Sequence, residues 1–137
     1  MDDASNVQAI KDYWGRDGLG QAILDALAAG GKNLDALTID DYLIANPSRT
    51  VLVRVKGDSM QEAGILDGDL AVVEKRNTAR RGEIVIAIVD NQFTLKRLDM
   101  ERGRFVLCPE NKAYPVIRPE GTLEIFGVMV GLVRKTT

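Results

Sequence analysis

The chain contains no histidine, and this absence limits the chemistry that it can carry out. A Ser-His-Asp triad is excluded, so a serine nucleophile needs another base, for which a lysine held in its neutral form is the known variant. With no histidine and a single cysteine, Cys108, the chain offers neither a zinc site nor a partner for an internal disulfide. We therefore expect a protein of a reducing compartment that uses no metal and no cofactor.

The chain also lacks a long apolar run and an excess of positive charge. No stretch approaches the length that spans a bilayer, and the acidic start of the chain is unlike a secretory signal. Eighteen basic and 20 acidic residues give a net charge of -2, which argues against a domain whose main task is holding nucleic-acid phosphates. These features predict a cytoplasmic protein with no membrane anchor and no direct sequence-specific binding to DNA.

The 137 residues divide into two parts that differ in composition and in hydrophobic pattern. Residues 1–46 are rich in alanine, aspartate and leucine, and apolar residues at helical spacing predict a helix that stops at the glycines of 28–31. Thr38 offers a capping oxygen for a second short helix that ends before Pro47. We expect an N-terminal helical arm over 1–46 and a separate domain over 47–137.

The second part has the pattern of β-strands. Runs of β-branched and apolar residues predict strands at 51–55, 69–74, 83–89, 92–98, 104–107 and 123–133. Asp90-Asn91 is a turn signal that joins two of them as a hairpin. The predicted fold class is mainly β, a compact, coiled and largely antiparallel sheet or partly closed barrel, with a short helical N-terminal arm.

The candidate catalytic residues are Ser59, in Gly57-Asp58-Ser59-Met60, and Lys96. An ammonium is no base, so Lys96 must lose its proton near neutral pH, and burial favours this because desolvation penalises the charged form. A turn at Gly57 lets the backbone N–H groups of Asp58 and Ser59 point at one oxyanion. Each part alone also has an ordinary explanation, because strand lysines are usually solvated and Gly-Asp-Ser is usually only a turn.

Successive blocks of the second part resemble the LexA/UmuD-type self-cleaving peptidases. The blocks are 55–60, 64–70, 82–85, 93–98, 107–115 and 123–130, and the resemblance covers about residues 43–134. It implies that Ser59 is the nucleophile and Lys96 the general base of a serine endopeptidase that cuts its own chain upstream of the catalytic domain. It also implies a homodimer in contact through the last strands, and stimulation by RecA filaments on single-stranded DNA.

The short arm favours the mutagenesis branch of this family. Repressors of the LexA type carry a helix-turn-helix domain and a linker, for which about 46 residues are too few, whereas 42–48 resemble the entry to a UmuD-type domain. The resemblance then implies a role in the SOS response and in error-prone translesion synthesis, with the catalytic subunit of an error-prone DNA polymerase as partner.

Three alternatives to a UmuD-type peptidase are compatible with some of the same residues. One is a catalytically idle dimeric adaptor with the same fold, and another is the peptidase domain of a LexA-like repressor that lacks its DNA-binding domain. Membrane signal peptidases share the Ser-Met and Lys arrangement, but they need a membrane anchor that is not found here.

The bond that is cut can also be placed by the resemblance. Family members cut between a small residue or cysteine and glycine, so Ala29–Gly30 is the candidate bond and Gly30–Gly31 a weaker one. A helix C-cap explains these glycines equally well, and the two interpretations stay open.

Overall fold

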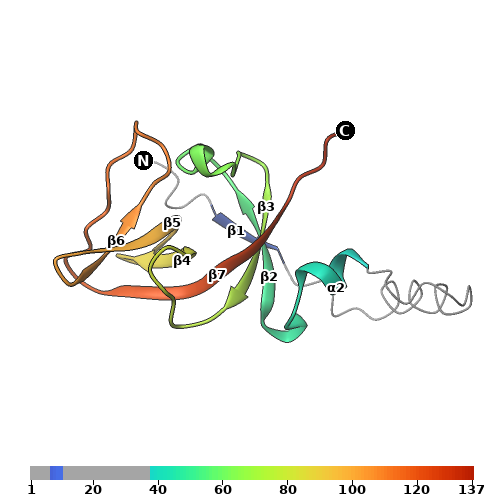
Figure 1. Cartoon of the computed structure of the whole chain (residues 1–137), viewed down its shortest axis with the longest axis horizontal. Coiled ribbons are helices and arrows are strands. Elements are labelled where there is room, and N and C mark those ends of the chain that lie inside the picture. Colours follow the sequence, from blue (N-terminus) through green and yellow to red (C-terminus); the bar gives the residue numbers. More distant parts are fainter. Residues whose placement is uncertain (1–6, 11–37) are drawn as a thin grey trace, which may run out of the picture.

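The computed structural model of the chain describes residues 7–10 and 38–137, whose strands form one sheet (Figure 1). In chain order the strands are β1 (Val7–Ile10), β2 (Thr50–Val55), β3 (Leu70–Lys75), β4 (Ile84–Val89), β5 (Gln92–Glu101), β6 (Arg104–Cys108) and β7 (Leu123–Val133). Their order across the sheet is β1-β2-β3-β7-β4-β5-β6, and every pair of neighbours is antiparallel. The expected mainly β, antiparallel fold class is confirmed.

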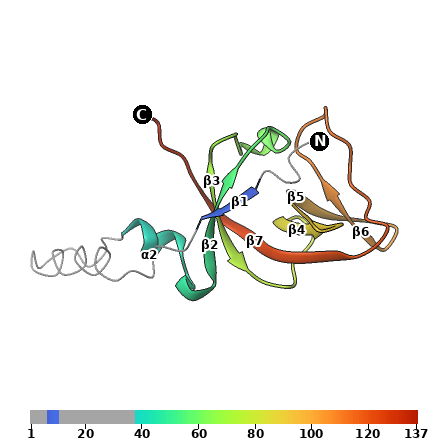
Figure 2. The same ribbon diagram turned by 180° about the vertical axis from the view of Figure 1, so that it is seen from behind.

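The second of the two expected helices is present as α2 (Ile39–Leu43). The side chain of Thr38 caps it, accepting a hydrogen bond from Asp41 N at 3.1 Å, and the helix ends before Pro47 as expected. A 3-10 turn, η2 (Pro47–Arg49), then leads into β2. In both ribbon views α2 lies at the end of the sheet away from β6 (Figure 2). The other expected helix lies outside the described residues, and the division into an arm and a domain stays a prediction.

Strand β1 was not predicted from the sequence. It lies within the part expected to be a helical arm, and it joins the sheet by pairing with β2, with Val7 opposite Val55. Four residues are too few to show a strand pattern, and the hydrogen bonds that hold β1 come from the edge of a distant strand. The sheet therefore begins with a segment that only tertiary pairing identifies.

The central strand β7 bends the sheet. Its pairing register shifts against β3 between Val72 and Val73, and against β4 between Ile86 and Ala87. Such bulges bend a strand and increase its twist. The sheet curls accordingly, because β1 at one end contacts β5 near the other. This is the coiled sheet that the sequence predicted.

The core holds together strands that are not neighbours in the sheet. One buried cluster draws on β2, β3, β4 and β5 and on the segment that follows β2; its members are Val53, Val55, Met60, Ile65, Ala71, Val73, Ile86 and Leu95. Packing of these apolar side chains is the main stabilising contribution to the curled arrangement. It holds the end of β2 against β5, where the candidate residues lie.

Two hairpins complete the second half of the sheet. Asp90 and Asn91 both have positive φ, 51° and 66°, as a two-residue hairpin turn requires, and the predicted turn is confirmed. Strand β5 runs on to Glu101, beyond the predicted end at 98, because a second turn at Arg102-Gly103 brings back β6 as its partner.

Candidate active site

Ser59 lies in a tight loop directly after β2. Gly57 opens the loop with a φ of 88°, a left-handed conformation that favours glycine, and its N–H donates to Asp67 Oδ1 at 2.8 Å. The next residues pass into a 3-10 turn, η3 (Gln61–Ala63), and the buried Met60 anchors it in the core. Ser59 is only 2% exposed, so the loop presents its hydroxyl to the interior.

Lys96 is buried on β5, also at 2% exposure. Its Nζ donates to Thr94 Oγ1 at 2.8 Å and to the carbonyl oxygen of Leu95 at 3.2 Å. Thr94 is on the same face of the strand as Lys96, because residues two positions apart in a strand share a face. A solvated surface lysine, the ordinary explanation for this residue, is therefore wrong.

The two candidate residues meet although β2 and β5 are not adjacent in the sheet. A hydrogen bond joins Lys96 Nζ and Ser59 Oγ over 3.2 Å. The strands are separated in the sheet order by β3, β7 and β4, so the curl of the sheet creates this contact. A hydroxyl and an amine at this distance in a buried site have the geometry of a nucleophile and its base.

A loop over 109–115, for which the sequence predicted no supporting role, holds the Ser59 loop (57–60) in place. The N–H of Glu110 donates to the carbonyl oxygen of Ser59 at 2.8 Å, and Glu62 N donates to the carbonyl oxygen of Glu110 at 2.8 Å. Asn111 Nδ2 donates to the carbonyl oxygen of Asp58 at 2.8 Å, and Tyr114 Oη donates to Asp58 Oδ1 at 2.5 Å. Asn111 and Tyr114 are more than 50 positions from Asp58, so no local pattern could have revealed these contacts.

An ion pair between Asp69 and Arg134 supports the chain segment that follows Ser59. Asp69 is 2% exposed, and its carboxylate accepts hydrogen bonds from the Arg134 guanidinium and from Leu66 N. The hydrogen bond from Arg134 lowers the pKa of Asp69 despite burial, which acts the other way. Arg134 Nη2 also donates to the carbonyl oxygen of Gly64, so the last residues of the chain brace the turn that follows Ser59.

The comparison with known protein families agrees with this geometry. The family model described as Peptidase S24-like matches residues 18–130. The chain belongs to this family. The resemblance to the LexA/UmuD-type peptidases that the sequence suggested is thereby confirmed.

Individual members of the S24-like family are similar over most of the chain. Protein SamA of Salmonella typhimurium is 45% identical over 102 residues, which are 74% of this chain and 71% of that protein. The LexA repressors of Clostridium novyi and Alcanivorax borkumensis are each 40% identical, over 82% and 89% of this chain. The matched regions are 59% and 62% of these repressors, so the chain spans less than two thirds of their length.

The described residues leave some expectations about this S24-like chain untested. The candidate bond Ala29–Gly30, and Gly30–Gly31 beside it, lie outside the described residues. Strand β1 does lie beside the site, because it pairs with β2, which leads to Ser59, and contacts β5, which carries Lys96. Among residues 7–10 and 38–137, no helix is long and apolar enough to cross a membrane.

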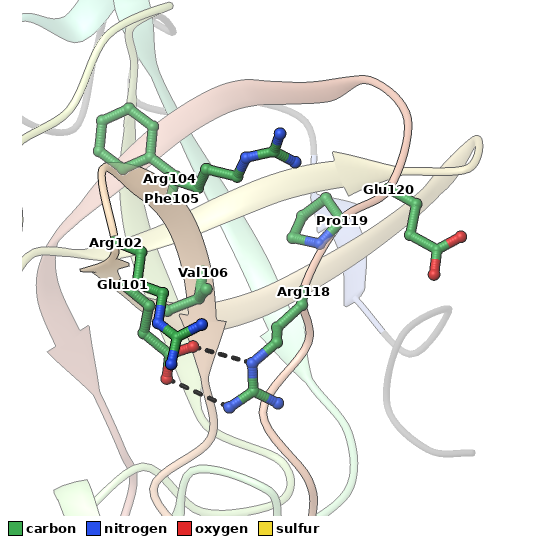
Figure 3. Close-up of a pocket in the computed structure, with 8 residues that line it drawn as sticks. All are labelled: Glu101, Arg102, Arg104, Phe105, Val106, Arg118, Pro119 and Glu120. Atoms are coloured by element: carbon green, nitrogen blue, oxygen red, sulfur yellow. Dashed lines mark hydrogen bonds and ion pairs between the residues drawn. The ribbon is translucent and has the colours of Figure 1, made fainter.

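A groove of about 890 Å³ has none of the candidate residues in its lining, which Figure 3 shows. It is formed around the β5–β6 turn and the segment 118–120, and Arg102, Arg104 and Arg118 line it together with Glu101 and Glu120. The Arg118 guanidinium donates to both carboxylate oxygens of Glu101, at 2.8 and 3.2 Å. Arg118 is thus neutralised by an ion pair within the groove, and the groove shares no lining residue with the Ser59 and Lys96 site.

Proposed function

We propose that this S24-like chain is a serine endopeptidase that cleaves its own N-terminal part, with Ser59 as nucleophile and Lys96 as general base. The observation that carries the proposal is the 3.2 Å hydrogen bond between Lys96 Nζ and Ser59 Oγ, with both residues 2% exposed. Desolvation of this kind favours a neutral amine, which is the form that accepts a proton. Membership of a peptidase family supports the same chemistry.

The reaction follows from these positions. Ser59 Oγ attacks the carbonyl carbon of the scissile peptide while Lys96 Nζ takes the hydroxyl proton, and the N–H groups of Asp58 and Ser59 stabilise the oxyanion. The Lys96 ammonium returns the proton to the leaving amine as the peptide bond breaks and an acyl-enzyme forms. Water then attacks the acyl-enzyme with Lys96 again as base, which releases the new carboxyl terminus and restores Ser59.

Strand β1 supports this proposal, because it is an extended segment that lies beside the two candidate residues' strands. It runs antiparallel along β2 and contacts β5, the two strands that lead to Ser59 and carry Lys96. Strand addition presents a backbone in extended form, which a peptidase requires of its substrate. We place the cut at Ala29–Gly30, with Gly30–Gly31 as the second choice.

The cellular role follows from the family resemblance. We propose that RecA filaments on single-stranded DNA stimulate the cleavage by favouring a cleavage-competent placement of the arm, so that it takes place in the SOS response in the cytoplasm. The cleaved protein then acts as a homodimer with the catalytic subunit of an error-prone polymerase. Exposed apolar side chains on α2 and β7 fit such a dimer surface, with Tyr42 at 75% and Val130 at 43% exposure.

Incubation of the purified chain at alkaline pH tests the peptidase. We expect two fragments whose masses place the cut at Ala29–Gly30, faster cleavage with RecA filaments, and no cleavage in Ser59→Ala or Lys96→Ala. Ser48→Ala and Lys75→Ala are matched controls, because both side chains are exposed and remote from the site in sequence. An intact wild-type chain under all these conditions, with RecA filaments present, would show that the function is wrong.

The adaptor alternative makes the opposite prediction for the same variants. An idle adaptor does not cleave, and Ser59→Ala changes neither its dimer nor its binding to a polymerase subunit. A buried amine in contact with a serine hydroxyl has no evident use in an adaptor, because burial of an amine costs free energy. This cost is the reason for preferring the peptidase.

A further inference from the structure

We propose that Asn111 is a positioning residue that aims the backbone N–H of Ser59 at the oxyanion formed during cleavage, an inference that rests on the peptidase function proposed above. Asn111 Nδ2 donates to the carbonyl oxygen of Asp58 at 2.8 Å. That carbonyl belongs to the peptide unit that joins Asp58 to Ser59. Asn111 therefore acts on the same rigid group that carries the Ser59 N–H.

The planarity of the peptide bond carries the argument from one atom to the other. In a trans peptide the C=O and N–H bonds point to opposite sides of the chain, and no peptide bond among the described residues is cis. Fixing the Asp58 carbonyl oxygen therefore fixes the direction of the Ser59 N–H. Gln61 N donates to the same oxygen at 3.2 Å, so two donors hold it.

The side chain of Asn111 is itself held on both of its polar atoms. Its Oδ1 accepts from Ala113 N at 2.9 Å, while Nδ2 donates to Asp58. These two contacts determine that the amide nitrogen, and not the oxygen, faces the Ser59 loop. The hydroxyl of Tyr114 donates to the Asp58 carboxylate, so the same loop holds Asp58 at two points.

The neighbouring residue connects this loop to the strand of the base. The Glu110 carboxylate accepts a hydrogen bond from Arg97 Nε at 3.2 Å, and Arg97 follows Lys96 on β5. The Glu110 N–H donates to the carbonyl oxygen of Ser59. The loop 109–115 thus spans the two halves of the site. Among the described residues, the hydrogen bonds of the Asn111 side chain go to Asp58 and Ala113 alone. Its effect should fall on oxyanion stabilisation and not on the base.

The test is to replace Asn111 with alanine and, separately, with aspartate in the full chain. Asn111→Asp keeps the shape and the acceptor for Ala113 N but loses the donor to Asp58. Two rates are measured: self-cleavage at its high-pH plateau, and modification of Ser59 by a fluorophosphonate probe. We expect both rates to fall by about 100-fold in each variant, the scale of losing one oxyanion donor.

A control separates this effect from loss of fold. Asn77 lies at an exposed bend after β3, and its side chain makes no hydrogen bond within the described residues, so Asn77→Ala should cleave at the wild-type rate. Thermal unfolding of all variants tests whether they are folded at the assay temperature. If Asn111→Ala does not fold, the cleavage and probe-labelling rates of Asn111→Asp test the proposal.

The pH profile separates positioning of the oxyanion donor from an effect on Lys96. For Asn111→Ala we expect the plateau to fall while the midpoint of the alkaline rise stays at its wild-type position. A shifted midpoint would mean that Asn111 acts through the base, and an unchanged plateau would mean that it has no role; either result overturns the proposal. A wild-type chain that neither cleaves nor reacts with the probe overturns the peptidase function and this inference with it.

Discussion

Lys96 Nζ donates to Thr94 Oγ1 at 2.8 Å, a shorter distance than the 3.2 Å that separates it from Ser59 Oγ. The threonine is two residues before the lysine on β5 and is buried on the same face. A flexible four-carbon side chain has many rotamers, so a fixed partner near its tip restricts where the amine can lie. Thr94 therefore orients Lys96 Nζ toward Ser59 Oγ, the proposed base and nucleophile.

Thr94→Val should slow self-cleavage while leaving the fold intact. Valine has a similar shape, so the core stays filled, but the hydrogen bond to Nζ is lost. One hydrogen bond contributes about 1 kcal/mol, which corresponds to a rate lower by roughly fivefold to tenfold. The rate of fragment formation measures the effect. Thr78→Val, at an exposed position of the loop after β3, is the matched control, and equal rates for the two variants would contradict the role of Thr94.

The ion pair between Asp69 and Arg134 should make stability depend on pH in the acid range. The pKa of Asp69 is lowered from its usual value of 3.8, chiefly by the hydrogen bond from Arg134. The unfolded state then binds the proton more tightly than the folded state, so the stabilisation is fully present above about pH 4 and is lost as pH falls through the lowered folded value. Urea unfolding between pH 7 and pH 2 measures this loss.

Asp69→Asn isolates the contribution of that carboxylate. We expect a lower free energy of unfolding at pH 7 and a smaller loss toward low pH than in the wild type. Asp41→Asn, on the exposed first turn of α2, should keep the wild-type slope. If Asp69→Asn retains the full acid dependence, other carboxylates such as Glu74 carry it, since hydrogen bonds from Asn46 and Arg76 also lower the pKa of Glu74.

Local signals predicted most of the strands but not their assembly. Apolar alternation and the Asp90-Asn91 turn are properties of adjacent residues, and the structure confirms the elements that they predicted. The central place of β7 and the pairing of β1 depend on contacts between distant segments, which no local pattern encodes. The bulges that curl the sheet likewise arise only once β7 pairs with β3 and β4.

The candidate site was predictable in its residues but not in its supports. The absence of histidine and the resemblance singled out Ser59 and Lys96, and the structure brings them within hydrogen-bond distance. Asn111 and Tyr114 appear in the sequence as ordinary polar residues of a loop. Their value depends on the backbone oxygen and carboxylate of Asp58, which lie more than 50 positions away.

Gly127 should be the glycine of β7 that is least tolerant of a side chain. A Cβ built at this position lies 2.7 Å from the carbonyl oxygen of Glu74 and 2.7 Å from Val73 Cγ1, both on the neighbouring strand β3. Since a main-chain oxygen in a paired strand cannot move aside, Gly127→Ala should lower the free energy of unfolding by about 1–3 kcal/mol. Gly121→Ala is the matched control, because nothing lies within 4 Å of its Cβ, and it should change stability little. Urea unfolding of the two variants measures the difference. Equal stabilities would show that β7 does not approach β3 so closely, and would contradict the tight packing that curls the sheet and brings Ser59 to Lys96.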